Sequence, residues 1–373
     1  MNGTRIWGGV EAASTYLVKE LAQLDGLDLH IVTLGNPTWT TTNGNKLDGA
    51  TVHVLPKFPR LEFARNFRTY QAQLDRLLAE IKPDVVHAQG ATDHAYAALR
   101  SGYPTVVTVH GVQSEDGKYQ GTFLKRARKI LYSRLIERYN LTHTRHLIAI
   151  GRYVVEYFRK TLRRDVQVYF IPNAIDERYF RLSEPRDGCT ILYAGRVIPR
   201  KRLLDLIQAF ALIAPQIPSA QLRVAGEVES EPGYARLVTQ AISQAHLGDR
   251  VQMLGGLSEQ AILHEFATCD VLALPSIQET TPMVIAQAMA AGKPVVATPV
   301  GGVTEMVQDG ENGFLVPVGE PKKLAGALQA VLGDSHLRMR MGHAGRQYAI
   351  DNYLAASVAH KTHEVYTKIV AGN

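Results

Sequence analysis

Four cationic side chains fall within seven residues of one another, directly after an apolar segment at 190–194 and before a helical pattern at 203–213. They are Arg196, Arg200, Lys201 and Arg202. A helix N-terminus already carries partial positive charge and free N–H groups, so cations there are unfavourable unless an anion binds. Arginine can grip phosphate oxygens with two hydrogen bonds, and lysine supplies a movable point charge. The pattern indicates a phosphate site, with a solvated basic loop as the alternative.

A carboxylate stands just ahead of a second predicted helix. Glu279 follows the apolar segment 270–274 and is itself followed by Thr280, Thr281 and Pro282. Thr281 is predicted to be the N-cap of the helix and Pro282 its first residue. A carboxylate between a strand and a helix can accept hydrogen bonds from sugar hydroxyls, or it can simply complement the helix dipole. The segment alone favours neither role.

Two histidines and a glycine pair complete the candidate residues. His110 directly follows a predicted strand at 105–109, and His87 lies within another at 84–88. A lone histidine at a strand end is more often a structural residue, so both roles stay open here. Gly8 and Gly9 precede a helical pattern, where backbone amides could approach an anion. That signal is weak by itself.

These residues are positioned by short β-branched segments that alternate with longer helical patterns, the rhythm of a parallel α/β sheet. The predicted strands are 29–33, 51–55, 84–88, 105–109, 146–150, 166–171, 190–194, 221–225, 250–254, 270–274 and 294–297. Predicted helices include 63–81 and 123–139, and the chain from Pro321 onward is predicted to be helical. Two doubly wound sheets would direct the C-terminal ends of their strands toward a central cleft, where such sheets bind ligands.

The length of 373 residues predicts two domains. We expect an N-terminal Rossmann-like domain over 1–172, a linker over 173–188, a second Rossmann-like domain over 189–345, and helices over 346–373 that could cross back to the first domain. Only 1–7 precede the glycine pair, and they contain no apolar strand. The first strand of a doubly wound sheet is central, so we expect a gap in the core and a late or truncated start.

Composition narrows the class of protein. Hydrophobic residues make up 46% and charged residues 20%, and no apolar run approaches the ~18 residues of a membrane span. Cys189 and Cys269 are too few for a disulfide framework or a thiolate zinc site. The start shows no secretion signal, so we expect a cytoplasmic protein. A net charge of +6 fits anionic partners without choosing among them.

Taken together, the motifs resemble the GT4 family of glycosyltransferases, which have the two-domain GT-B fold. Gly195-Arg196 followed by Lys201, and Glu279 opening a helix that ends in AMAAGKPVVAT, resemble its donor-binding signatures. The segments GGVTE at 301–305 and DGENGFLV at 309–316 follow in the same order. The match is close over 171–320 and looser in the N-terminal half, where GGVE at 8–11 resembles the family's glycine loop.

The resemblance implies a retaining transferase that uses a nucleotide diphosphate sugar as its donor substrate and needs no further cofactor or metal. Arg196 and Lys201 would stabilise the leaving diphosphate, Glu279 would orient the sugar, and His110 would contact it. Gly8, Gly9, Thr280 and Thr281 would lie at the donor, while His87 has either a structural or an acceptor-side role. The family's second glutamate, which binds the ribose, is replaced by Gln287, so that contact loses its charge.

The acceptor is expected to be a glycan, a lipid-linked sugar or a small molecule. Basic and apolar side chains interleave over 123–139, and such a helix could lie on an anionic membrane on the inner face; the alternative is a helix with one core face and one solvated basic face. Nucleic acid is not expected as a partner. Two other functions remain open: a nucleotide-sugar epimerase of similar architecture, and a degenerate member that binds without catalysis.

Overall fold

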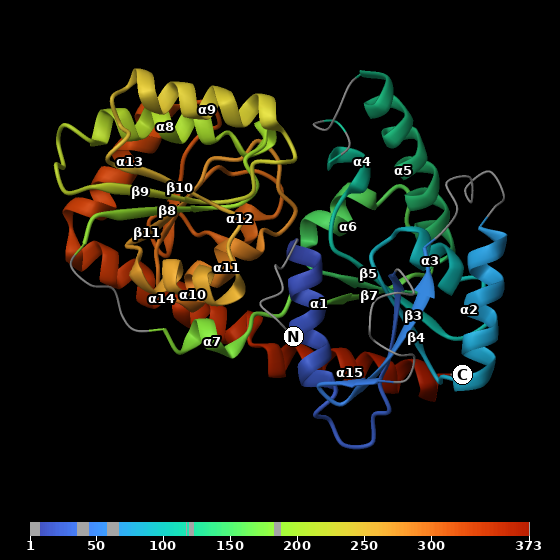
Figure 1. Ribbon diagram of the computed structural model, residues 1–373. Coiled ribbons are helices and arrows are strands. Elements are labelled where there is room, and N and C mark those ends of the chain that lie inside the picture. The colour runs from blue at the N-terminus through green and yellow to red at the C-terminus, as the bar shows by residue number, and fades with distance from the viewer. Residues whose placement is uncertain are drawn as a thin grey trace. The chain divides into compact units, whose positions relative to one another are not determined.

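The computed structural model describes residues 8–35, 45–57, 67–116, 118, 123–182 and 188–372. The chain divides into two compact units, shown in Figure 1. Unit 1 contains residues 8–12 and Ile175–Leu354, and unit 2 contains Ala13–Ala174 and the C-terminal segment from Ala355. The chain passes between the units at 12/13, 174/175 and 354/355, whereas the predicted limits of the two Rossmann-like domains were 172 and 345. The predicted linker contains a short helix, α7 (Glu177–Phe180), and its residues 183–187 lie outside the described chain.

Unit 1 is built on a parallel sheet that, among the described residues, has six strands in the order β10-β9-β8-β11-β12-β13. The strands are β8 (Thr190–Ala194), β9 (Gln221–Ala225), β10 (Val251–Gly255), β11 (Val271–Leu274), β12 (Val295–Ala297) and β13 (Gly313–Leu315). The apolar runs that predicted β8, β11 and β12 are buried on both faces over most of their length, as a parallel sheet requires, whereas the edge strand β10 has an exposed residue, Gln252. The short β13 was not predicted.

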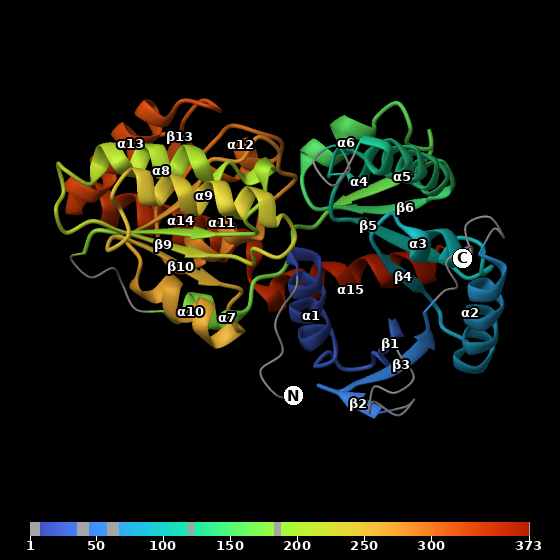
Figure 2. The same cartoon turned by 45° about the horizontal axis from the view of Figure 1, so that its top comes forward.

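Helices cover both faces of the unit 1 sheet (Figures 1 and 2). On one face lie α8 (Leu203–Ile213), α9 (Pro232–Gln244) and α13 (Pro321–Gly333), and on the other α10 (Glu259–Thr268), α11 (Met283–Ala290) and α14 (Ser335–Tyr353). A further short helix is α12 (Val303–Met306). One large cluster of buried residues joins β8, β9, α8 and α13, including the fully buried Tyr193 and Phe210. This core fixes the loops at the C-terminal ends of β8 and β11.

Unit 2 contains two sheets. A parallel sheet has the order β4-β5-β6-β7, and a smaller one has the order β1-β3-β2, with β2 antiparallel to β3. The strands are β1 (His30–Gly35), β2 (Asn45–Leu47), β3 (Ala50–Pro56), β4 (Val86–Gln89), β5 (Thr105–Val109), β6 (His146–Ala149) and β7 (Gln167–Phe170). The short β2 was not predicted. The larger sheet packs on an apolar cluster that includes Leu141, Leu147 and Val154.

The helices of unit 2 are α1 (Gly9–Leu21), α2 (Arg68–Ile81), α3 (Asp93–Ala98), α4 (Gln113–Asp116), α5 (Phe123–His143), α6 (Arg152–Phe158) and the C-terminal α15 (Ala355–Ala371). Helix α1 starts with the last residues of the unit 1 segment 8–12. Of the predicted helix 63–81, residues 63–66 lie outside the described chain, and the helix begins at Arg68 because Phe67 before it has a left-handed φ of 53°. Tyr366 of α15 bonds His87 of β4, so α15 is part of this unit.

The two sheets of unit 2 are not joined through β1 and β4, the edge strands that lie at one end of each sheet order. Among the described strands, β1 pairs with β3 alone and β4 with β5 alone. The apolar side chains of Ile31 and Val32 on β1 are only half-buried. Residues 1–7, where the sequence showed no first strand, lie outside the described chain, so the expected gap in the core stays a prediction.

Candidate functional site

The loop after β8 is shaped by two glycines. A Cβ atom on Gly226 would lie 1.9 Å from the carbonyl oxygen of Gly195, so only glycine allows these backbones to approach. The amide of Gly195 donates to Ala225 at 2.9 Å, and the buried hydroxyl of Tyr193 donates to the carbonyl of Arg196 at 2.9 Å. The loop therefore leaves the sheet along a fixed path and brings the cationic residues to the start of α8.

The cationic residues of this loop have different partners. Residues Pro199–Lys201 form one turn of 3-10 helix, and α8 begins after Arg202, whose φ of 49° is left-handed. Arg202 forms an ion pair with Asp205 in the first turn of α8 at 2.6 Å, so this cation compensates a carboxylate of its own helix. Arg200 is buried and donates to the carbonyl and side-chain oxygens of Gln278. Arg202 thus fits the alternative of a solvated basic loop, whereas Arg200 contacts the segment after β11.

Lys201 and Glu279 form a buried ion pair. The Lys201 Nζ lies 2.6 Å from Glu279 Oε1, and Arg200 lies 3.5 Å from the other carboxylate oxygen. The side chains are 12%, 7% and 9% exposed for Lys201, Glu279 and Arg200. They meet because β8 and β11 are parallel neighbours, which places their C-terminal ends at one edge of the sheet.

The protonation of this pair follows from its surroundings. Burial by itself would raise the pKa of Glu279, but Lys201 and Arg200 outweigh it and the pKa lies below the ordinary value. Burial lowers the pKa of Lys201, although Glu279 acts in the opposite direction. Two cations therefore face one carboxylate where little water enters. The excess positive charge favours an added anion.

The segment before α11 differs in one detail from its prediction. Pro282, not Thr281, occupies the N-cap position, with extended backbone angles, and α11 starts at Met283. The buried Thr281 hydroxyl has no hydrogen-bond partner within the described chain. The amide of Gly302 donates to the carbonyl of Thr280 at 2.7 Å, in a contact that a Cβ on Gly302 would block. This backbone contact with Gly302, not side-chain capping by Thr281, holds the segment that carries Glu279.

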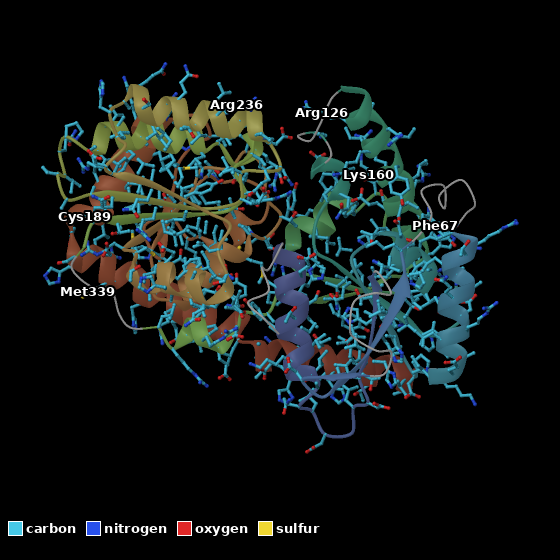
Figure 3. The ribbon with its side chains drawn as sticks, in the orientation of Figure 1. Phe67, Arg126, Lys160, Cys189, Arg236 and Met339 are labelled. Carbon is cyan, nitrogen blue, oxygen red and sulfur yellow. The ribbon has the colours of Figure 1, made fainter. Side chains whose placement is uncertain are left out.

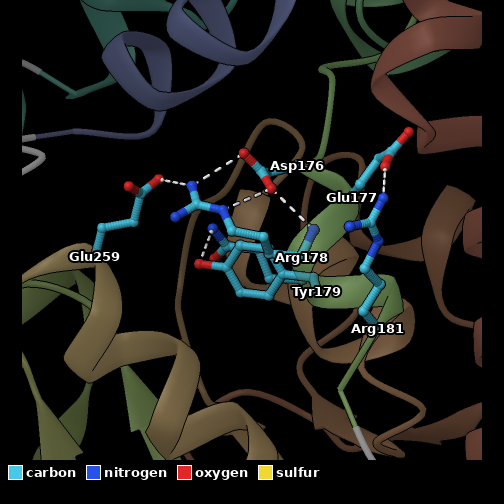
Figure 4. Close-up of polar contacts among 7 residues, drawn as sticks. Asp176, Glu177, Arg178, Tyr179, Arg181 and Glu259 are labelled. Carbon is cyan, nitrogen blue, oxygen red and sulfur yellow. Dashed lines mark hydrogen bonds and ion pairs between the residues drawn. The ribbon is translucent and has the colours of Figure 1, made fainter.

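Gln287 lies on α11 and is buried against α7. Its amide nitrogen donates to the hydroxyl of Tyr179 at 3.0 Å; Tyr179 is labelled in Figure 4. Beside it, Arg178 bridges Asp176 at 2.8 Å and Glu259 at 2.6 Å, which ties α7 to α10. Tyr179 is a partner that no sequence signal indicated.

Gly9 opens α1, and in unit 1 it lies against the start of α11. A Cβ on Gly9 would be 3.2 Å from Cγ of Met283, which is tight for any larger residue. Gly8 precedes the helix and is exposed. The glycines therefore suit a close backbone approach at a helix start.

His110 and His87 belong to unit 2 and form one half-buried polar network. His110 Nε2 is 2.7 Å from Gln89 Oε1, and its Nδ1 is 2.9 Å from Asn173 Oδ1. His87 contacts Thr108 and Tyr366, each at 2.6 Å. Burial lowers the pKa of His110 to about 4 and that of His87 to about 3. Both rings are therefore neutral near pH 7. Sequence reasoning missed Gln89 and Asn173, although each follows a predicted strand.

His110 also borders a small pocket of unit 2. Gln89, Thr108, Asn173 and apolar side chains of α1, β6, α15 and the segment after β7 line the rest of it. In the described chain, this pocket included, no group of three or more histidine, cysteine or acidic side chains could hold a metal ion. In that same part of the chain, no helix combines the length and apolar character needed to span a bilayer.

Two family models match consecutive parts of the chain. Residues 7–179 match the model described as Glycosyltransferase Family 4, and residues 175–348 match Glycosyl transferases group 1. The second match contains Arg196, Lys201, Glu279 and Gln287, and the first contains His110.

Curated relatives cover the chain to different extents. N-acetyl-alpha-D-glucosaminyl L-malate synthase of Bacillus anthracis is 24% identical over 97% of this chain and 94% of its own length. An exopolysaccharide phosphotransferase of Streptomyces coelicolor is 34% identical over 54% of this chain, but the match covers 21% of that relative. D-inositol 3-phosphate glycosyltransferase of Nocardioides is 31% identical over 45% of this chain and 39% of its own length.

Solved structures with the same fold cover nearly the whole chain. Sucrose-phosphate synthase from Thermosynechococcus elongatus aligns with a TM-score of 0.82 and 22% identity, over 98% of this chain and 94% of its own. HepE of Anabaena in complex with UDP and glucose aligns with a TM-score of 0.77 and 20% identity, over 96% of each chain. These likenesses concern the fold.

Proposed function

Because the chain belongs to the GT4 family of glycosyltransferases and has the GT-B fold, we propose that it transfers a sugar from a nucleotide diphosphate sugar to an acceptor with retention at the anomeric carbon. The observation that carries the proposal is the buried cluster in which Arg200 and Lys201 both lie close to Glu279. A diphosphate supplies the negative charge that this cluster lacks. The complex of the related HepE fold with UDP and glucose supports a donor of this class.

In the proposed mechanism, unit 1 stabilises the leaving group. The Lys201 ammonium has three N–H donors and gives one to Glu279, which leaves donors for phosphate oxygens. Lys201 and Arg196 thus supply the positive charge that a divalent ion provides in other transferases. Glu279 orients the sugar, His110 contacts it, and the leaving phosphate helps to accept the proton of the acceptor on the same face of the sugar.

A donor screen tests this function. We expect one class among UDP, GDP and ADP sugars to raise the melting temperature, since a ligand at ~100 times its Kd stabilises by ~2.7 kcal/mol. The donor so found should then be consumed only when an acceptor is present. Consumption without acceptor would instead indicate the epimerase, and no stabilisation by any of the three classes would contradict the donor site.

Gln287→Glu is predicted chiefly to lower the donor Michaelis constant and to leave turnover little changed. If Gln287 lies over the donor ribose, a carboxylate restores a charge-assisted hydrogen bond away from the reacting carbon, similar in ground and transition states. The substitution also reverses the bond to Tyr179, whose hydroxyl can donate to the new carboxylate. Steady-state kinetics with the best donor measure both constants.

Tyr179→Phe is the matched control for Gln287, because it removes only the hydroxyl that the amide contacts. If Gln287→Glu raises the Michaelis constant instead, repulsion from the diphosphate outweighs the new hydrogen bond. If neither Gln287→Glu nor Gln287→Ala changes either constant, the assignment of this helix to the ribose is wrong.

We further propose that α5 places unit 2 on an anionic membrane surface, where a lipid-linked acceptor would be available. The outer face of α5 carries Leu131 and Leu135, 62% and 50% exposed, among the exposed Arg128, Arg134 and Arg138. Arg126, labelled in Figure 3, is exposed near the start of the same helix. A helix with only a core face and a basic face would bury these leucines. Exposed apolar side chains among arginines suit an interfacial helix.

The purified protein is therefore expected to co-sediment with anionic vesicles and not with neutral ones, and salt should weaken the association. Leu131→Ser with Leu135→Ser should reduce the bound fraction. Leu237→Ser is the control, because Leu237 is 54% exposed on α9 of unit 1. Equal and negligible sedimentation with both vesicle types would leave α5 as an ordinary basic surface.

A further inference from the structure

The imidazole of His110 is held from two sides by amide groups. Gln89 ends β4 and approaches Nε2 at 2.7 Å, while Asn173 follows β7 and approaches Nδ1 at 2.9 Å. Both amides and the ring line the same pocket of unit 2. The ring orientation is therefore set by two residues from strands on opposite sides of β5 and β6.

A neutral ring cannot satisfy both amides through their oxygens. Burial lowers the pKa of His110 to about 4, so near pH 7 the ring carries one N–H group and one lone pair. It can donate to one carbonyl oxygen only. The other amide must present its NH₂ group, which has nearly the same shape after the amide is rotated by half a turn.

His87 decides which amide is rotated. The Gln89 amide nitrogen lies 3.2 Å from His87 Nε2 and 3.4 Å from its Nδ1, and the hydroxyls of Thr108 and Tyr366 contact these nitrogens at 2.6 Å. The amide nitrogen is therefore close to both ring nitrogens, one of which carries a lone pair in the neutral ring. A rotated Gln89 would bring its carbonyl oxygen against this lone pair. Its oxygen therefore stays directed at His110.

We propose that Gln89 and Asn173 are positioning residues that hold His110 in its Nε2–H tautomer. In this arrangement Nε2–H donates to Gln89, and the Asn173 amide donates to the lone pair of Nδ1. A sugar hydroxyl that replaces Asn173 at Nδ1 must then be a donor. This last consequence rests on the proposed function, whereas the tautomer does not.

Long-range ¹H–¹⁵N correlation spectra of the histidine side chains test the tautomer in the full chain without ligand. His110→Gln identifies the signal by its loss. We expect a protonated Nε2 and an unprotonated Nδ1 at pH 7. A protonated Nδ1 in the wild-type protein, with or without a proton on Nε2, overturns the proposal.

Asn173→Asp gives a second test, because a carboxylate can only accept a hydrogen bond. Nδ1 of His110 should become protonated, and turnover should fall roughly tenfold, the effect of losing one hydrogen bond. Gln167→Glu, the same change at the exposed start of β7, should leave the His110 spectrum unaltered. An unchanged His110 tautomer in Asn173→Asp contradicts the proposal. If the Asn173→Asp protein does not fold, Gln89→Leu provides a second variant. If His110 has the expected tautomers but no sugar transfer is detected, the proposed function is contradicted and the proposed tautomer is not.

Discussion

Glu279→Gln is expected to cost about 3–5 kcal/mol of unfolding free energy, because it removes the carboxylate that faces the buried cations Lys201 and Arg200. The amide keeps one acceptor for the Lys201 ammonium, so the geometry is conserved while the charge is lost. Transfer activity should fall as well, since the sugar loses the carboxylate that orients it. Urea unfolding measures the free energy, and an unchanged slope shows that the unfolded state is the same.

Glu259→Gln is the matched control for Glu279→Gln. Glu259 also pairs with an arginine, but its side chain is 29% exposed and that of Arg178 is 44% exposed. Exposed pairs contribute about 0–1 kcal/mol, so the loss should be small. If Glu279→Gln and Glu259→Gln lower the free energy of unfolding by the same amount, Glu279 does not stabilise the buried cations Lys201 and Arg200.

The loss of stability at acidic pH should depend on the ion pair between Lys201 and Glu279. The pKa of Glu279 is lowered in the folded state, so its contribution is present above the ordinary carboxyl pKa and is lost as pH falls through the folded value. The wild-type protein should therefore lose stability more steeply than Glu279→Gln over this acidic range. Parallel curves would mean that another carboxyl group governs the acid limb.

Lys201→Ala and Arg196→Ala are each expected to lower turnover by about ten- to a few hundredfold with the fold intact. A lost hydrogen bond to a charged group costs roughly 1.5–3 kcal/mol, and each 1.36 kcal/mol is about tenfold in rate. The fold persists in Lys201→Ala because Glu279 keeps Arg200 at 3.5 Å. Single-turnover and steady-state rates with the best donor measure the effect, and far-UV circular dichroism checks the fold.

Arg202→Ala is the control for this pair of variants. Arg202 lies in the same basic loop, but its ion pair with Asp205 directs it to α8. Its removal should change turnover little. Unchanged transfer in Lys201→Ala, in Arg196→Ala and in the double variant would remove both residues from the mechanism.

Much of the fold followed from local patterns. The predicted strands at 190–194 and 221–225 coincide with β8 and β9, because short, mostly apolar runs that end at a glycine are typical of parallel strands. The short strands β2 and β13 escaped prediction, since three residues are too few to show a period. The start of α11 was one residue off because the Thr281 hydroxyl does not cap it.

The sequence by itself determined that a cationic loop follows one strand, that Glu279 follows another, and that each precedes a helix. Only the tertiary structure decided which side chains meet. The pairing of β8 with β11 brings Lys201 to Glu279, while Arg202 is directed to its own helix. Gln287 meets Tyr179, and His110 meets Gln89 and Asn173, across long separations in the chain. Such contacts depend on strand order and helix packing, which place distant residues within hydrogen-bonding distance and leave no periodic signal along the sequence.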